Sequence, residues 1–468
     1  MIGAIDFESD RPALLLEGKD QVISYRELGQ RVADVRQLLR ELARPALVFQ
    51  FAGNSAASIT TYLACLAEKI PLGFGEPSAA ARARVIAAYT PTAVLLPESD
   101  GVPATDYEIA GHVAGGLVLW HRRGNAPYAV QPHDSLALLL ATSGSTGDAK
   151  CVRLSLGNLE ANARSIARYL EIGTGEVAAQ SLPIHYSYGL SVLNSHFVAG
   201  GAVLLTQHSF LRPEFWRAAE QGGATSFAGV PYMYETLHRL RLMPADKAPS
   251  LRTLTQAGGP LRVELVRHFH EGAARRQARF FVMYGQTEAT ARISYVPPDR
   301  LTEKLGTVGI AIPDGALRLE PVDGAPNLHQ LHYRGPNVML GYASAPADLA
   351  RGDEQRGELA TGDLAESDAD GFFRITGRLA RFAKLFGKRV NLASVEAEAE
   401  KTFAVRTAVL DGGDYLRVFL EASADETATK VRAHLAELLG VPPLAIKMEL
   451  LAQIPLTASG KKDYKALA

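Results

Sequence analysis

Apolar and polar positions alternate along the first 300 residues in two different rhythms. After Ser24, apolar residues recur every three or four positions, at Leu28, Val32, Val35 and Leu39. This spacing predicts a helix within residues 22–44, with Ser24 as its N-cap. A short apolar run at residues 46–51 then predicts a strand, and helical spacing returns over 55–68.

The same alternation of short β-rich runs with helical segments continues along the chain. It covers residues 84–97, 158–171, 174–182, 190–206 and 212–228. Strands that alternate with helices of this length are typical of α/β proteins with mainly parallel sheets flanked by helices. The pattern therefore predicts a large N-terminal α/β domain, although strand order cannot be predicted from it.

The pattern changes after Gly306. Short strands are predicted at residues 317–320, 330–333 and 371–376, between turns rich in Gly, Pro and Asp. They indicate a small β-rich subdomain over about residues 306–376.

The elements predicted after residue 378 follow the order β-α-β-β-α-β, with helices near 393–401 and 427–438 and strands near 405–410 and 415–421. A segment of ~90 residues is long enough for a separate α+β lid. We therefore predict an N-terminal domain at residues 1–378 and a small mobile C-terminal domain at 379–468, with the boundary near 377–383.

Composition narrows the class of protein. The 468 residues are 47% apolar and 21% charged, with a formal net charge of -1. This balance is that of an ordinary globular protein of more than one packed unit, and it gives no sign of a nucleic-acid partner. Neither of the two cysteines, Cys65 and Cys151, lies in a metal-type cluster, which favours a reduced compartment over a disulfide scaffold.

The N-terminus carries acidic residues where a signal peptide would carry positive charge, and no apolar run reaches the ~18 residues that would span a bilayer. We expect a cytoplasmic protein without a membrane span, as a monomer or homodimer.

A loop rich in glycine and hydroxyl groups lies between two predicted strands, residues 135–141 and 151–155. Glycines let backbone N–H groups surround an anion, hydroxyls add donors, and a terminal lysine adds a positive charge. The residues that would hold phosphate are Thr142, Ser143, Gly144, Ser145, Thr146, Gly147 and Lys150. The P-loop pattern does not apply, because Ala149 and Cys151 replace its glycine and its Ser/Thr. A glycine-serine hairpin with a chance lysine is the structural alternative.

This loop resembles the signature of the adenylate-forming superfamily, which includes acyl-CoA synthetases, adenylation domains and firefly luciferase. Family members usually have proline in place of Ala149. Further segments match the family's motifs in the family's order, at residues 182–190, 257–261, 284–288, 361–363, 377–378, 384–389 and 455–461. The resemblance thus covers nearly the whole chain.

The resemblance assigns a nucleotide site. It implies that adenine is bound by Gly258, Gly259, Pro260, Tyr284 and Gly285, and the ribose hydroxyls by Asp363 with Arg378. It further implies that the Thr287 hydroxyl contacts the α-phosphate and that Glu288 binds Mg²⁺, a cation that takes one or two carboxylates beside phosphate oxygens. A solvated surface carboxylate is the alternative for Glu288.

The acyl pocket implied by the resemblance is lined by His185, Tyr186, Tyr188 and Gly189. Relatives that activate α-amino acids have an aspartate at the position matching Gly189, so an aliphatic or aryl acid is expected instead. Without the surrounding motif, His185 would be interpreted as a histidine whose imidazole has only a structural role.

The resemblance implies catalytic roles for His185, for Thr287 and for two lysines of the predicted lid, Lys461 in the first half-reaction and Lys384 in the second. The alternatives are a frayed basic tail for Lys461, which has Lys462 beside it, and a solvated strand end for Lys384. Ala380 stands where the family commonly has a hinge aspartate or lysine.

Taken together, the resemblance implies an AMP-forming acid-thiol ligase. Such an enzyme uses ATP and Mg²⁺ to make an acyl-adenylate, and then passes the acyl group to the pantetheine thiol of coenzyme A or of a carrier protein. Because no carrier domain is recognisable, we expect the acceptor to come in trans. Two alternatives are a luciferase-like oxidoreductase and a non-catalytic nucleotide-binding regulator.

Overall fold

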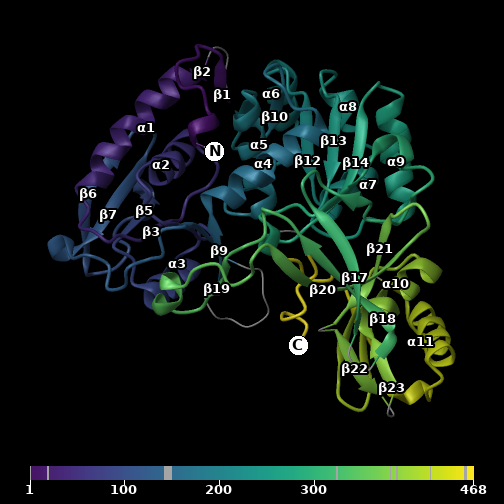
Figure 1. The fold of residues 1–468 in the computed structure, drawn as a ribbon. Helices are drawn as coiled ribbons and strands as arrows, with labels where there is room; N and C mark the ends of the chain where they lie inside the picture. The colour runs from purple at the N-terminus through teal and green to yellow at the C-terminus, as the bar shows by residue number, and fades with distance from the viewer. Residues whose placement is uncertain are drawn as a thin grey trace. The chain divides into compact units, whose positions relative to one another are not determined.

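The computed structural model describes residues 2–17, 21–141, 150–322, 325–379, 381–385, 388–421, 423–457 and 461–468 (Figure 1). The chain forms two compact units. The first consists of Met1–Leu305, Ala311–Ala316 and Arg334–Leu359, and the second of Gly306–Ile310, Leu317–Tyr333 and Ala360–Ala468.

The first long helix begins where the sequence predicts. Helix α1 (Tyr25–Arg40) starts with a capping box, in which the Ser24 hydroxyl accepts from the Glu27 N–H at 3.1 Å and the Glu27 carboxylate accepts from the Ser24 N–H at 2.8 Å. The four predicted apolar positions of this helix are all buried. The prediction of helix and N-cap is confirmed.

One sheet of the first unit has nine strands, in the order β16-β15-β14-β13-β12-β10-β11-β1-β2. Its middle strands are parallel, and antiparallel strands lie toward its ends. The strands are β1 (Pro12–Leu16), β2 (Val22–Ser24), β10 (Val177–Ala179), β11 (Ala202–Leu205), β12 (Ser226–Gly229), β13 (Thr253–Gln256), β14 (Arg279–Tyr284), β15 (Ser294–Val296) and β16 (Ile310–Ala311). The helices of this stretch are α4 (Leu156–Leu170), α5 (Ser187–Ala199), α6 (Pro213–Gln221), α7 (Pro231–Arg239), α8 (Pro244–Lys247) and α9 (Val263–Ala274).

The second sheet of this unit has the order β19-β9-β8-β4-β3-β5-β7-β6. Its strands are β3 (Val48–Gln50), β4 (Leu72–Phe74), β5 (Ala93–Pro97), β6 (Tyr107–Val113), β7 (Leu117–Arg122), β8 (Leu136–Ala141), β9 (Cys151–Ser155) and β19 (Gly341–Ala343), with helices α2 (Ala56–Ala67) and α3 (Ala79–Tyr89) between the early strands. Its central strands β8, β4, β3 and β5 are parallel. The predicted α/β class is therefore confirmed.

Strands β8 and β9 form an antiparallel pair in which Ala141 lies opposite Cys151. The glycine-rich loop therefore joins the two strands of a hairpin. Its residues Thr142, Ser143, Gly144, Ser145, Thr146 and Gly147 lie outside the described part of the chain, and their phosphate-binding role stays a prediction.

In the second unit a four-stranded sheet of order β17-β18-β20-β21 precedes the C-terminal elements. Its strands are β17 (Ala316–Val322), β18 (Ala325–Arg334), β20 (Glu358–Ser367) and β21 (Phe373–Arg378). The later elements are the hairpin of β22 (Phe382–Leu385) and β23 (Lys388–Asn391), helices α10 (Leu392–Phe403) and α11 (Asp425–Leu439), and the sheet of β24 (Thr407–Asp411), β25 (Leu416–Glu421) and β26 (Ile446–Leu451). The predicted strands and helices of the tail are all present.

The four-stranded sheet groups with the C-terminal elements in one compact unit. The predicted boundary near 377–383 lies inside that unit, so the division at residue 378 and the mobility of the C-terminal part stay predictions.

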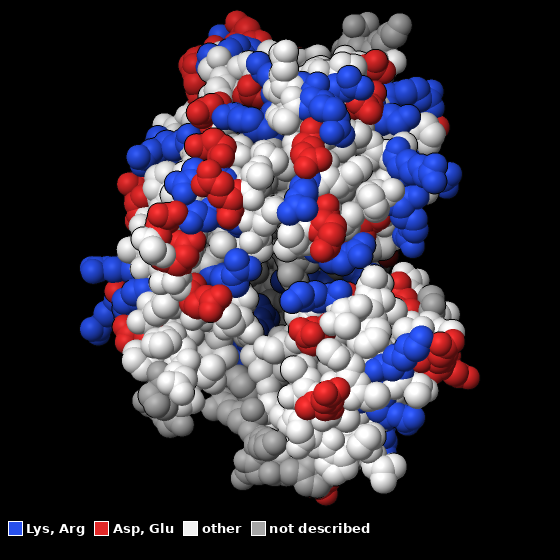
Figure 2. Space-filling view, turned by 90° about the vertical axis from the view of Figure 1, so that its right-hand side faces the viewer, with Lys and Arg blue, Asp and Glu red and all other residues white. Residues whose placement is uncertain are grey.

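The surface carries both signs of charge. Figure 2 shows acidic and basic side chains interleaved over the face it presents, in agreement with the net charge of -1. Every helix in the described ranges is either too short or too polar to cross a bilayer. Cys65 and Cys151 are both buried and unoxidised.

Candidate active site

Two motifs of the first unit meet at Tyr342. The ammonium group of Lys150 lies 3.5 Å from the centroid of the Tyr342 ring, and the Tyr342 hydroxyl donates to Glu288 Oε1 at 2.8 Å. Strand β19 pairs with β9 so that Tyr342 lies opposite Val152, which brings its ring beside the lysine. Burial and the Glu288 carboxylate raise the pKa of Tyr342, so its hydroxyl remains protonated and able to donate.

Sequence reasoning missed Tyr342. Its role comes from the pairing of two strands far apart in the sequence, and no motif marks it. The apolar-polar pattern gives the strands but not their partners.

The Glu288 carboxylate suits magnesium. It is half-buried and has one oxygen engaged by Tyr342. Within the described ranges no group of three or more His, Cys, Asp or Glu side chains could hold a metal. A single carboxylate fits Mg²⁺ better than a dedicated protein cage, since that ion keeps several waters and takes oxygens from bound phosphates.

The 284–288 motif also contacts the predicted acyl pocket. The hydroxyl of Thr287 lies 3.2 Å from that of Ser187, the first residue of α5. At Gly285 an added Cβ would lie 1.8 Å from the carbonyl oxygen of Ala291, so only glycine fits the tight turn after β14. Beside it, the Gln286 amide donates to the Tyr284 hydroxyl at 3.2 Å.

The predicted adenine loop lies against Tyr186. Gly258 has φ +92°, and a Cβ there would lie 2.7 Å from the Tyr186 hydroxyl. Glycine is thus needed both for the backbone and for the approach of the ring. The Gly259 carbonyl accepts from the Gln256 amide at 2.8 Å, and Pro260 is exposed.

His185 is a neutral group in this structure. Burial lowers its pKa to about 4, and its Nδ1 has no hydrogen-bond partner among the described residues. At pH 7 the imidazole can therefore line a pocket and hydrogen-bond, but it cannot supply positive charge to phosphates. The nearby Tyr188 hydroxyl shares a 2.8 Å hydrogen bond with Thr255.

Gly189 is tightly packed against the backbone of the preceding residues. An added Cβ would lie 2.2 Å from the Pro183 carbonyl oxygen and 2.8 Å from that of Leu182, so backbone packing alone accounts for glycine here. A side chain at this position would require the neighbouring backbone to shift. The place of Gly189 in the acyl pocket, and the expectation that its lack of a carboxylate disfavours α-amino acids, stay predictions.

In the second unit, Asp363 and Arg378 lie opposite each other on β20 and β21, as members of one antiparallel register. The Arg378 Nε donates to Asp363 Oδ1 at 2.6 Å, and Asp363 is 1% exposed. Their joint role at the ribose stays a prediction. Lys384 lies on β22 opposite Arg389, and its side chain is outside the described part.

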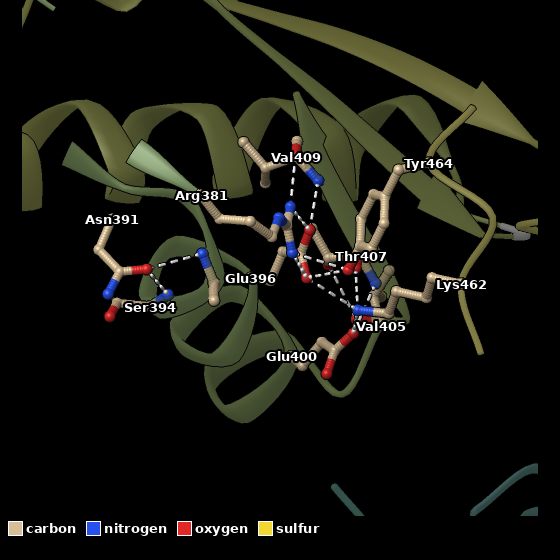
Figure 3. A network of polar contacts seen from close by, with 11 residues as sticks. Arg381, Asn391, Ser394, Glu396, Glu400, Val405, Thr407, Val409, Lys462 and Tyr464 are labelled. Atoms are coloured by element: carbon tan, nitrogen blue, oxygen red, sulfur yellow. Dashed lines mark hydrogen bonds and ion pairs between the residues drawn. The ribbon is translucent and has the colours of Figure 1, made fainter. Parts of the chain in front are cut away.

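The two adjacent lysines near the C-terminus have different surroundings, and Figure 3 shows those of Lys462. The Lys462 ammonium lies 2.7 Å from a Glu400 oxygen and 3.2 Å from a Glu396 oxygen, and it donates to the Thr407 carbonyl. Lys461 is exposed, and its backbone carbonyl accepts from the Thr457 N–H at 2.8 Å. Lys462 therefore has a structural role, and Lys461 is the lysine whose side chain faces outward.

Glu396 is the centre of this network. Its buried carboxylate accepts from Arg381 at 2.7 Å, from the Tyr464 hydroxyl at 2.9 Å and from the Val409 N–H at 2.7 Å. Burial opposes its ionisation, but Lys462 and Arg381 outweigh burial and hold the pKa of Glu396 below its ordinary value. The network ties α10 to the C-terminal segment that carries Lys461.

The predicted site residues thus fall into two groups. The first unit brings together Lys150, Glu288, Thr287, Tyr186 and Gly258 through the contacts above. Asp363, Arg378 and Lys461 belong to the second unit, and their convergence on the same nucleotide stays a prediction.

Comparisons with known proteins show what the chain is similar to. A family model described as AMP-binding enzyme matches residues 4–343. Feruloyl-CoA synthase from Amycolatopsis sp is 31% identical over 272 residues, which cover 57% of this chain and 54% of that protein. The matched part is thus about half the length of that relative. Sulfoacetate–CoA ligase from Cupriavidus necator is 28% identical over 392 residues, covering 79% of this chain and 72% of that protein.

The fold is also similar to a solved structure, the o-succinylbenzoate CoA synthetase of Bacillus subtilis in complex with its acyl-adenylate intermediate. The TM-score is 0.77 at 22% sequence identity, and the match covers 97% of this chain and 94% of that one.

Proposed function

We propose that this chain, which belongs to the family of AMP-binding enzymes, is an AMP-forming acid-thiol ligase. A carboxylate oxygen of the substrate attacks the α-phosphorus of ATP, the bond to the bridging oxygen breaks, and pyrophosphate leaves. A pantetheine thiolate then attacks the acyl carbon of the adenylate, forms the thioester and expels AMP. The observation that carries the proposal is the meeting of Lys150, Tyr342 and Glu288 in one place.

The chemistry requires neutralisation of charge rather than proton transfer. Two anions must approach each other, and charge spreads over the phosphoryl oxygens in the transition state. Lys150 supplies a positive charge, Thr287 a hydroxyl donor, and Glu288 a ligand for Mg²⁺, which would neutralise phosphate oxygens when bound. Tyr342 holds the Glu288 carboxylate with its hydroxyl and presents its ring to Lys150. Lys461 would complete this set from the second unit, and Lys384 would face the adenylate in the thiol step.

The proposed substrate is an aliphatic or aryl carboxylic acid. Tyr186 and Tyr188 supply aromatic surface, and their ring centroids lie 6.3 Å apart in an edge-to-face arrangement. Relatives named for ferulate and sulfoacetate support a carboxylic acid and coenzyme A as the reactants. A carrier protein is the other acceptor within the proposal, and the cytoplasmic location and the monomer or homodimer state stay predictions.

The test is ATP–pyrophosphate exchange with a panel of carboxylic acids, followed by thioester formation with coenzyme A and with a phosphopantetheinylated carrier protein. Exchange that depends on one class of acid supports the proposal. Oxygen uptake or light from a bound adenylate would instead favour the luciferase-like alternative. A lack of exchange with every acid would favour the non-catalytic regulator and overturn the proposal.

A Tyr342→Phe variant tests the contact between Tyr342 and Glu288, because it keeps the ring beside Lys150 and removes the hydrogen bond to Glu288. Loss of a hydrogen bond to a charged group costs about 1.5–3 kcal/mol, roughly a ten- to hundredfold slower exchange with a higher Mg²⁺ requirement. Tyr295→Phe is the control, since it also removes a tyrosine hydroxyl of the same unit, from a ring that stacks on Tyr169. Unchanged exchange in Tyr342→Phe would contradict the proposed role of Tyr342.

A further inference from the structure

Arg292 is a buried arginine without a carboxylate partner. It is 2% exposed and lies just before β15 in the first unit. Its guanidinium carbon is 4.6 Å from the Tyr188 ring centroid, one terminal nitrogen is 3.5 Å from the Ser191 hydroxyl, and its Nε has no hydrogen-bond partner among the described residues. None of the described carboxylates forms an ion pair with it.

The same unit shows how a buried arginine is normally compensated. Arg153 is also fully buried, and it pairs with the Glu354 carboxylate and donates to backbone carbonyls of Tyr342 and Gly352. Because an uncompensated buried charge is costly, arginines inside proteins are generally paired in this way. Arg292 instead faces the Tyr188 ring and the hydroxyl groups of Ser191 and Tyr169, none of which carries a negative charge, and its Nε has no hydrogen-bond partner among the described residues.

Arg292 lines a cavity beneath α5. Its lining is mainly apolar and includes the polar side chains Ser191, Ser195, His196, Ser226 and Thr255. The acidic residue on this lining is Glu176, whose carboxylate is already paired with Arg252 at 2.9 Å. The cavity therefore contains an unneutralised positive group together with hydroxyl groups that can hydrogen-bond an anion.

The backbone is shaped to direct Arg292 inward. Thr290 and Ala291, the two residues before it, have φ values of +59° and +121°, in a region that non-glycine residues rarely adopt. The Arg292 carbonyl is fixed by the Asn337 amide at 2.8 Å. Strained backbone of this kind persists only where the surroundings impose it, and it is concentrated at binding and catalytic sites.

We propose that Arg292 is a specificity-determining residue that binds a second anionic group of the acid substrate, a carboxylate or sulfonate remote from the reacting carboxyl. The inference rests on the proposed ligase function and narrows its substrate to diacids and sulfo-acids. Tyr188 joins the two regions, since it belongs to the predicted acyl pocket and its ring also packs against the guanidinium. The planar guanidinium group of arginine binds a carboxylate through two parallel hydrogen bonds. A monoacid has no second anionic group to accept them.

The experiment compares acids in matched pairs, hexanoate with adipate and propionate with 3-sulfopropionate. In ATP–pyrophosphate exchange the wild type should prefer the doubly anionic member. Arg292→Met should lower kcat/KM for that member by about 10- to 150-fold, the factor expected for a lost hydrogen-bonded charge, while leaving the monoacid unchanged or improved. The loss should appear mainly in KM, because the contact is the same in ground and transition states. For the doubly anionic acid, the kcat/KM of Arg292→Lys should lie between those of the wild type and Arg292→Met, because lysine keeps the positive charge but cannot form two parallel hydrogen bonds.

Arg217→Met is the matched control, because this arginine is 64% exposed on α6 and pairs with Glu214. The inference would be overturned if Arg292→Met lost the same factor in kcat/KM for both acids of each pair, or if the wild type showed no preference for the doubly anionic acid. Thermal unfolding tests the role of Arg292 without relying on the ligase reaction. Adipate should raise the unfolding temperature of the wild type more than hexanoate does, and Arg292→Met should abolish that difference. Exchange with monoacids only would refute the role of Arg292 and leave the ligase proposal standing.

Discussion

At the scale of single residues, Lys461 and Lys462 show how neighbours of identical chemistry acquire different roles. Lys462 is surrounded by two carboxylates and a carbonyl group, with 17% of its side chain exposed, whereas Lys461 lies on the surface. A lysine committed to two carboxylates cannot also bridge substrate and phosphate. The geometry therefore supports Lys461 as the adenylating lysine.

We predict that Lys461→Ala slows carboxylate-dependent pyrophosphate exchange by about two to three decades, equivalent to ~3–4 kcal/mol, because one charge donor to the transition state is lost. Thioester formation from synthetic acyl-adenylate should be retained, and the unfolding temperature should not change. Lys462→Met is the informative comparison. It should lower the unfolding temperature, since it removes the cation that pairs with Glu400 and leaves Glu396 with Arg381 alone. Equal loss of both half-reactions in Lys461→Ala would mean that Lys461 is not specific to the first step.

Gly189 illustrates a residue whose identity is set by space. We predict that Gly189→Ala lowers the free energy of unfolding by at least about 1–3 kcal/mol, the usual cost of overpacking, because the added methyl would meet backbone oxygens that cannot rotate away. Denaturant unfolding measures the effect. Gly157→Ala in the first turn of α4 is the control, since its Cβ would lie 3.5 Å from the Ser155 hydroxyl, an ordinary van der Waals distance. An unchanged free energy of unfolding in Gly189→Ala would show that the backbone around Gly189 can accommodate a methyl group.

At the scale of elements, local signals predicted the structure well. Ser24 and Glu27 specify the start of α1 by themselves, because both partners of the capping box lie within one turn. The apolar runs on either side of residues 142–150 predicted both strands of the β8–β9 hairpin. Contacts between distant segments were not predictable. Nothing near Tyr342 indicates β9 as its neighbour, and nothing near Lys462 indicates Glu396, because these contacts depend on how elements pack.

The Glu396 network makes one such packing contact testable. We predict that Glu396→Gln lowers the free energy of unfolding by about 3–5 kcal/mol at pH 7, because Arg381 and Lys462 remain buried without their shared carboxylate. The folded state holds the pKa of Glu396 below its ordinary value. This contribution is therefore fully present above the unfolded pKa of about 4.3 and is lost as the pH falls below it.

The measurement is urea unfolding of both proteins between pH 3 and pH 7. The stability gap between wild type and Glu396→Gln should narrow toward acid pH. Glu398→Gln, on the same helix but with 32% of its side chain exposed, should change little. A gap that stays constant with pH would show that the Glu396 carboxylate is not the source of the stability.

At the scale of the whole molecule, the proposed chemistry depends on residues from both compact units. The sequence identified most of these residues through the order of its motifs, with Lys150 and Glu288 in the first unit and Asp363 and Lys461 in the second. It could not indicate Arg292, because buried arginines are normally paired within the fold and only the packing reveals that this one is not. It could not indicate either that the β-rich sheet would group with the C-terminal elements, since strand pairing is long-range.

A double-mutant cycle between Lys150→Met and Lys461→Ala tests whether the two units act on one nucleotide. If both cations stabilise the same phosphoryl transition state, their effects on exchange should be coupled by about 0.5–3 kcal/mol, whereas independent sites add within ~0.3–0.5 kcal/mol. The double variant should then lose less activity than the product of the two single losses. Lys461→Ala combined with Arg217→Met should be additive, because Arg217 lies on the exposed face of α6. Additive effects in the Lys150–Lys461 cycle would mean that the two lysines act at separate sites. The hypothesis that both units act on one nucleotide would then have to be abandoned.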